Sequence, residues 1–165
     1  ISGVHDLLPN RTGGSALQKN LETLGDIQYT QEEIEFALEL QRNNGKPEIG
    51  IDGKIRPLRE TLNSPGGGST DSGDVSYNVP VVSLAATTAP KGVPWHSWSV
   101  VASSGMSIGH KGMLHAAKAL GMTMVDIFKD SKLRENIKKE FDEKIGEYEY
   151  DPYLDPGPPP IDYVD

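Results

Sequence analysis

The sequence predicts an α/β domain with few strands and therefore an incomplete sheet. Two helix-start patterns occupy the first third, a short apolar run over 79–84 reads as a strand, and a long periodic apolar stripe follows residue 109. The resulting order of two helices, two strands and two helices is typical of an α/β layer architecture. The stretch 66–121 holds both tryptophans and three of the four histidines, so any chemistry is expected there.

Two helices are predicted in the first 45 residues. Residues 15–18 have the capping-box pattern of a serine followed three residues later by a glutamine, and they predict a short helix that ends near Gly25. Residues 30–33 repeat the pattern with threonine and glutamate. They predict a better helix, with one apolar face and Gly45 as its end.

The middle of the chain predicts loop and strand. Residues 46–65 are interrupted by prolines and glycines, which indicates a loop in which a brief hairpin over 49–55 is one alternative. The apolar run 79–84 predicts a strand, and a second small apolar run follows Trp98.

The C-terminal third predicts two helices and an extended tail. Apolar residues recur every three or four positions from about 109 to 128, and Asp130 or Ser131 then caps a charged helix that ends near Gly146. The segment 148–165 is acidic and rich in proline and tyrosine, so we expect an extended surface segment.

Composition excludes several classes of protein. No run approaches the roughly 20 apolar residues of a membrane helix, and the absence of cysteine excludes disulfides and thiolate metal sites. Residues 140–165 carry nine of the 24 acidic residues and one of the 16 basic residues, so the rest of the chain is neutral. An acidic tail on a neutral body argues against a nucleic-acid-binding protein.

The first residues suggest a piece of a longer protein. The chain does not open on methionine, and it lacks the basic and apolar pattern of a secretory signal. We expect a cytoplasmic parent protein.

His96 is the candidate metal ligand. It lies in Pro94-Trp-His-Ser-Trp98, after the predicted strand, and strand ends are where ligands and metals collect in α/β sheets. Imidazole is the commonest protein metal ligand, and flanking tryptophans are expected to exclude water from it. Considered alone, a single histidine is more often a hydrogen-bonded structural residue than a metal ligand. Because zinc needs three or four ligands and no paired ligand motif occurs, further ligands must come from elsewhere.

Other candidate motifs have simpler structural explanations. Residues 105–109 match the G-x-S-x-G nucleophile elbow around Ser107, but no acid followed by a histidine comes after it, so small residues at a tight turn explain the match better. His110 and His115 are five residues apart, which does not align them on one helix face. The pair Glu32-Glu33 is accounted for by capping and solvent.

The glycine-rich loop 66–71 leaves two alternatives open. It lacks the Gly-Lys-Ser/Thr of a phosphate loop. Its backbone amides could still receive a carboxylate, and a flexible linker explains it equally well.

Three motifs together resemble the two-zinc amidohydrolase and carboxypeptidase family, with the closest similarity to its aminobenzoyl-glutamate branch. The loop ending Ser69-Thr70-Asp71 resembles the family's Gly-rich acidic loop, and Pro94 to Trp98 resembles the His-Ser turn that supplies the last zinc ligand. The run 107–117 resembles the helix that follows, and 3–10 resembles the strand that returns from the family's lid domain. Trp98 departs from the proline of many relatives.

The resemblance implies a fold and a division of the chain. It implies the C-terminal portion of a three-layer αβα catalytic domain, with 1–10 as the end of the lid strand, 11–147 as catalytic domain and 148–165 as the tail. The first zinc ligands and the general-base glutamate would lie upstream, in a missing N-terminal half. A homo-oligomer is implied for the intact enzyme.

The resemblance also implies roles for individual residues. His96 would hold one of two zinc ions, and no catalytic residue of this chain is implied. Asp71 would orient the loop or the second shell. Substrate or second-shell positions are also implied at Gly67, Gly68, Ser97 and Asn10.

Two functions follow as rivals. The first is part of a zinc-dependent hydrolase that cleaves an amide next to a carboxylate-bearing amino acid, with this piece inactive alone. The second is a non-catalytic protein-binding module that uses the tyrosines of the tail, Tyr148, Tyr150, Tyr153 and Tyr163. As half of a domain, the chain would expose an apolar sheet face, and we expect self-association to cover it.

Overall fold

The structure is a computed structural model of the chain, and it describes residues 3–59, 70–154 and 157. In these ranges the chain forms six helices, which in chain order are α1 (Arg11–Leu24), α2 (Gln31–Asn43), α3 (Ser72–Ser76), α4 (Trp98–Ser104), α5 (Ser107–Lys129) and α6 (Ser131–Ile145).

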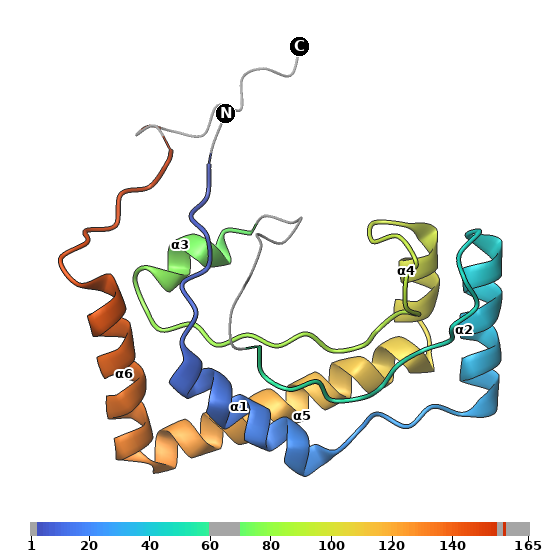
Figure 1. Cartoon of the computed structure of the whole chain (residues 1–165), viewed down its shortest axis with the longest axis horizontal. Helices are drawn as coiled ribbons and strands as arrows, with labels where there is room; N and C mark the ends of the chain where they lie inside the picture. Colours follow the sequence, from blue (N-terminus) through green and yellow to red (C-terminus); the bar gives the residue numbers. More distant parts are fainter. Residues whose placement is uncertain (1–2, 60–69, 155–156, 158–165) are drawn as a thin grey trace.

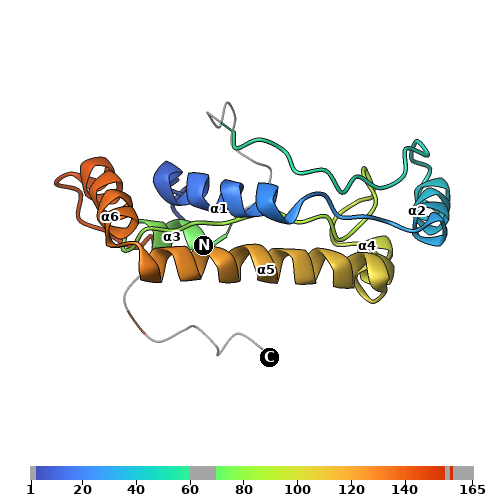
Figure 2. The same ribbon diagram turned by 90° about the horizontal axis from the view of Figure 1, so that it is seen from below.

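The helices form an open frame rather than a closed layered domain. The long helix α5 is the base, α6 and α3 stand at one end, and α2 and α4 stand at the other end (Figure 1). Helix α1 packs on α5, and the view from below shows that these two helices form thin, adjacent layers (Figure 2). Extended segments cross the space between the two ends.

The predicted α/β fold class is wrong for the described residues, in which no strand forms. The run 79–84 is extended after Val79 but has no partner strand, and the apolar run after Trp98 is the helix α4. The hairpin over 49–55 is not formed either. A short apolar run does not distinguish a strand from a helix, and extended backbone becomes a sheet only when a second strand pairs with it.

Most helix predictions are confirmed. In the capping box at Thr30 and Glu33, each side chain bonds the backbone of the other residue, as predicted. The Asp130 cap of α6 and the ends at Gly25 and Gly146 are also confirmed. The start predicted at residues 15–18 is wrong, because Asn10 caps α1 five residues before Ser15 by accepting a hydrogen bond from the Gly13 amide.

A single buried side chain fastens the extended segments to α2. The Gln41 amide donates to the carbonyl oxygens of Gly50 (2.9 Å) and Lys91 (2.8 Å), and its own oxygen accepts from the Gly50 N–H (2.8 Å). Side-chain bonds of this kind replace the backbone ladder that a sheet would provide. This explains how two extended segments lie together without forming a sheet.

The buried apolar core of the described residues is small, and its members are Leu17, Ala37, Leu40, Val93, Ile108, Ala119 and Ile137. None of the described helices is long and apolar enough to cross a membrane.

Candidate functional site

His96 occupies a strained turn directly before α4. Its backbone φ is 59°, in the left-handed region, and among the described residues it is the one non-glycine residue with a positive φ. Such a conformation costs about 1–3 kcal/mol for a residue with a side chain and is found preferentially at functional sites. The side chain is exposed to solvent. The turn therefore presents an imidazole outward, at an energetic cost that no hydrogen bond of the ring to another described residue offsets.

The tryptophans beside His96 do not shield it. Trp95 is 69% exposed and Trp98 is 55% exposed, so the expectation that they exclude water from the imidazole is not met within this chain. Large exposed aromatic side chains are characteristic of surfaces that another molecule covers. Shielding of His96 would need such a cover.

The described residues do not assemble a complete metal site. They contain no group of three or more histidine, aspartate or glutamate side chains that could hold a metal ion. The chemistry of His96 nevertheless fits zinc, since an exposed neutral imidazole is a good ligand. It fits as one ligand of a site that is completed from outside the described residues.

The structure separates the other predicted site residues. Asp71 is exposed at the start of α3, and α3 and α4 stand at opposite ends of the frame (Figure 1). Ser97 precedes α4, and its hydroxyl donates to the Pro94 carbonyl (2.5 Å), which closes the turn around His96. The predicted loop residues Gly67 and Gly68 lie outside the described residues. Asp71 and His96 are therefore not brought together.

Asn10 has a structural role that accounts for its burial. Its side-chain oxygen caps α1, and its side-chain nitrogen donates to the Ile137 carbonyl of α6 (2.9 Å). Asn10 also lines a cavity of about 890 Å³ between α1 and the extended segments 52–59 and 81–93. The assignment of Asn10 as a substrate contact stays a prediction. Both the oxygen and the nitrogen of its side-chain amide already make hydrogen bonds within the chain.

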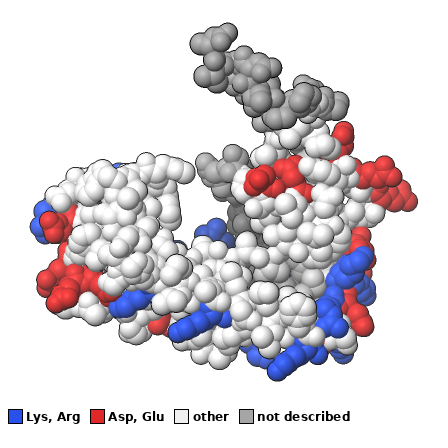
Figure 3. Space-filling view, turned by 180° about the vertical axis from the view of Figure 1, so that it is seen from behind, with Lys and Arg blue, Asp and Glu red and all other residues white. Residues whose placement is uncertain are grey.

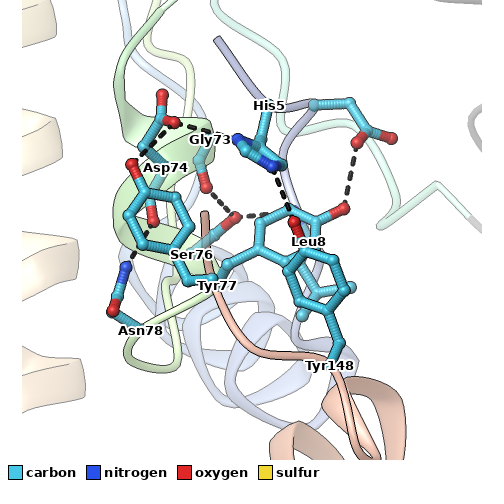
Figure 4. A network of polar contacts seen from close by, with 10 residues as sticks. His5, Leu8, Gly73, Asp74, Ser76, Tyr77, Asn78 and Tyr148 are labelled. Atoms are coloured by element: carbon cyan, nitrogen blue, oxygen red, sulfur yellow. Dashed lines mark hydrogen bonds and ion pairs between the residues drawn. The ribbon is translucent and has the colours of Figure 1, made fainter. Parts of the chain in front are cut away.

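A polar cluster that the sequence analysis did not identify surrounds His5 (Figure 4). The buried imidazole lies between the Asp74 carboxylate of α3 (Nδ1 to Oδ1, 3.0 Å) and the Tyr148 hydroxyl of the tail (Nε2 to Oη, 2.9 Å). The Tyr153 ring stacks on it, with 4.2 Å between ring centroids and 3° between planes. The Tyr150 hydroxyl donates to the same Asp74 oxygen (3.0 Å).

The electrostatics of the cluster follow from these contacts. The hydrogen bond with His5 and the bond from Tyr150, opposed by partial burial, lower the pKa of Asp74. Burial and the bond to Asp6 raise the pKa of Tyr77, whose ring lies 5.0 Å from His5. Asp74 is held as a carboxylate that orients His5, and the raised pKa values of Tyr77 and Tyr150 keep these two hydroxyl groups neutral.

The cluster fastens the tail to the start of the chain. Tyr148, Tyr150 and Tyr153 all contact His5 or Asp74, so three of the four tyrosines assigned to the protein-binding alternative are used inside the molecule. The fourth, Tyr163, lies outside the described residues. The sequence does show one histidine near its start and several tyrosines near its end. Neither segment contains a local pattern that predicts contact with the other, so the cluster could not be predicted.

An ion pair between Glu33 and Lys111 links α2 to α5. Glu33 accepts a hydrogen bond from Lys111 (2.6 Å) and is almost fully buried. Burial alone would raise the pKa of Glu33, but hydrogen bonds from Lys111, Ser107 and the Thr30 backbone lower it to about 2. Glu33 is thus a structural anion, as its capping role predicts.

Comparison with known proteins agrees with the sequence motifs. The chain is 34% identical over 157 residues to the B subunit of p-aminobenzoyl-glutamate hydrolase from Escherichia coli (strain K12), an alignment that covers 81% of this chain. The chain spans about a third (33%) of the length of that relative. No family model and no solved structure matches the chain. This similarity supports the resemblance to the aminobenzoyl-glutamate utilisation protein B branch of the amidohydrolase family that the motifs indicate.

Proposed function

We propose that the chain is the C-terminal portion of a zinc-dependent amidohydrolase that cleaves an amide bond to a carboxylate-bearing amino acid, such as aminobenzoyl-glutamate. The similarity to a hydrolase component over most of the chain is the observation that carries this proposal. The strained, outward-facing His96 supports it, because the turn maintains an unfavourable backbone to present one good metal ligand. The portion alone is expected to be inactive.

Within this proposal, each residue of the turn has a defined task. His96 would donate a neutral ring nitrogen to one metal ion, and the Ser97 hydroxyl would hold the turn through its bond to Pro94. Bound zinc would supply Lewis acidity and an activated water. We place the general base, a glutamate, in the upstream segment, as the resemblance to the family implies.

The extended segments support the proposal of a missing half. Among the described residues, no hydrogen bond involves the backbone of residues 81–86 or of 56–58. Both segments line the cavity of about 890 Å³. None of these residues is buried, so their backbone N–H and C=O groups are open to a further chain segment, as the groups of an unpaired edge strand are. We infer that a further part of the intact protein pairs with these segments and fills the cavity.

The test combines the chain with a separately expressed upstream segment of its parent protein. We expect the mixture to bind zinc in calorimetry and to hydrolyse aminobenzoyl-glutamate, and His96→Ala to lose both properties. His110→Ala is the matched control, because His110 is also exposed and is placed in no site. Zinc binding and hydrolysis by the His96→Ala mixture at the native level would refute the assignment of His96. A native mixture that binds zinc without cleaving any acyl amino acid would refute the proposed reaction.

A further inference from the structure

The end of α2 is bonded to the chain on both sides of the His96 turn. The Gln41 side chain donates to the Lys91 carbonyl, five residues before His96 (2.8 Å). The Asn44 side-chain nitrogen donates to the Ser99 hydroxyl, three residues after His96 (2.6 Å). Gln41 and Ser99 are fully buried and Asn44 is partly buried, so water competes little for these bonds.

No ion pair is available to hold this turn. The sequence has no lysine, arginine, aspartate or glutamate between Lys91 and Lys111, and the view from behind shows a broad uncharged surface over α4 (Figure 3). Among the described residues, the Asn44 bond is the one hydrogen bond that joins residues 92–100 to a part of the chain outside the turn and α4. The position of the turn therefore depends on this contact.

The strain at His96 requires such an anchor. A residue with a left-handed backbone persists only where the surrounding structure fixes it, because a relaxed backbone is lower in energy. The helix that follows the turn is short, since α4 spans only Trp98–Ser104, and a helix of this length is marginal by itself. The turn would therefore relax if its flanks were not fastened.

The end of α2 is a rigid support for this anchor. Its last turn is closed by backbone bonds from the Gly45 N–H (3.0 Å) and the Lys46 N–H (2.9 Å), in the Schellman arrangement that ends many helices. The Asn44 side-chain nitrogen also donates to the Leu40 carbonyl (2.7 Å). Because a carbonyl only accepts, this second bond fixes the amide with its nitrogen toward Ser99.

We propose that Asn44 is a positioning residue for His96. It fastens the flank after the turn, Gln41 fastens the flank before it, and together they maintain the backbone that presents the imidazole to the metal. Residues 41 and 44 are three positions apart, hence on one face of α2, so a single surface sets both flanks. The metal-binding part of this inference rests on the proposed function, whereas the fastening of the turn does not.

Amide hydrogen exchange in the metal-free, intact parent protein tests whether Asn44 fastens the turn. Asn44→Ala should increase exchange of the Val100 and Val101 amides, which bond the Ser97 carbonyl, at least about tenfold. The matched control is Asn43→Ala, which alters an exposed neighbour whose side chain bonds no other described residue. Native exchange at both amides in a folded Asn44→Ala protein would overturn the proposal.

Zinc calorimetry on the same intact protein tests whether the fastened turn serves the metal. When only a fraction of molecules holds the competent turn, the apparent affinity falls by that fraction. We expect Asn44→Ala to raise the dissociation constant of the zinc site that depends on His96 about tenfold, with the number of sites unchanged. Mere loss of folded protein would lower the number of sites and leave the dissociation constant native, which would overturn the positioning role.

Ser99→Ala removes the same bond from its other end. The variant fits the buried position without added volume, so it is an independent check should Asn44→Ala fail to fold. If Asn44 acts through Ser99, the double variant should raise the dissociation constant no more than either single variant does. Additive effects of the two changes would overturn this route.

The same measurements separate this inference from the proposed function. Native zinc binding by His96→Ala would refute the proposed function and the metal-binding part of the inference, and the exchange experiment would still decide whether Asn44 fastens the turn. Zinc binding that depends on His96 but is unchanged in Asn44→Ala would overturn the positioning role alone.

Discussion

At the scale of single residues, the informative positions are those that the chain holds against local preference. His96 keeps a left-handed backbone that a glycine would adopt freely. Glu33 keeps a negative charge under burial because Lys111 and the first turn of α2 bond it. The backbone of His96 is explained by the proposed metal-binding function. The buried charge of Glu33 is explained by its structural role, in which it caps α2 and bonds Lys111 of α5. Measurements of the free energy of unfolding distinguish these two roles, because a strained residue and a stabilising ion change stability in opposite directions when they are replaced.

Replacing His96 with glycine should stabilise the chain. The change removes left-handed strain, and after the greater unfolded-state entropy of glycine is subtracted the free energy of unfolding should rise by up to about 1 kcal/mol. His96→Ala keeps the strain and should stay within about 0.5 kcal/mol of native. Denaturant unfolding of the three proteins at low concentration gives both values. Equal stability of the glycine and alanine variants would contradict the strain argument.

Glu33 should make stability depend on pH in the acid range. Its folded pKa of about 2 lies below the ordinary 4.5, so its contribution is fully present above about pH 5 and is lost as pH falls toward 2. Glu33→Gln should therefore cost up to about 3 kcal/mol at pH 7. The difference from native should shrink on acidification.

Unfolding of both proteins at several pH values would measure this difference. Glu140, whose pKa is also lowered to about 2, titrates in both proteins and cancels in the comparison. A difference that is constant between pH 7 and pH 3 would show that the carboxylate charge of Glu33 contributes nothing to stability.

At the scale of elements, α5 organises the molecule by offering two different faces. Its inner face carries glycine and alanine residues, whose small size lets the backbones of α4 and of the extended segment approach the helix closely. A Cβ at Gly112 would collide with the Thr87 carbonyl of the extended segment, and one at Gly109 would collide with Ser104 of α4. Its outer face carries larger apolar residues that are exposed, such as Met113, Met124 and Phe128. The helix thus packs against the rest of the chain on one side and exposes apolar side chains on the other.

Gly112→Ala should separate the extended segment from α5. Because the obstructing atoms are backbone, the segment must shift, and we expect a loss of about 1–3 kcal/mol of stability. Gly105→Ala is the matched control, since its nearest such atom is the Val101 carbonyl at an ordinary 3.6 Å. Thermal unfolding of the two variants compares them. A native melting temperature for Gly112→Ala would show that the contact is not tight.

At the scale of the whole molecule, the two ends of the described chain are joined through His5. The cluster links the start of the chain, α3 and the tail, which are 69 to 143 residues apart in sequence. Because the buried apolar core is small, long-range polar contacts such as these hold distant parts of the chain together. The cavity of about 890 Å³ beside the extended segments and the exposed apolar face of α5 are the surfaces on which the proposed upstream segment would pack.

His5→Leu should release the tail. The change removes both imidazole bonds and leaves the partly buried Asp74 without its strongest partner, which should cost about 2–4 kcal/mol. Amide hydrogen exchange over residues 147–153 should rise sharply. Glu149→Gln, an exposed change in the same segment whose side chain bonds no other described residue, should leave the exchange unchanged. Unaltered exchange in His5→Leu would show that the tail is held by other contacts.

The sequence by itself determined α2, α5 and α6 and the family resemblance, whereas the run that forms α4 was predicted as a strand. Capping residues and three-to-four periodicity act within one or two turns, so α2, α5 and α6 could be read from their own residues. The motif around His96 was also local, and it pointed to the relative that the comparison found. What was predicted wrongly was the sheet, because strand pairing depends on a partner that no single segment specifies.

The tertiary structure alone decided which distant side chains meet. It paired His5 with Asp74 and the tail tyrosines, placed Asp71 and His96 at opposite ends, and left the apolar side of α5 uncovered by the described residues. These outcomes depend on how helices pack across more than a hundred residues of sequence, and no local pattern encodes that. The positive φ of His96 is likewise a tertiary result, since isolated histidine favours the opposite backbone region.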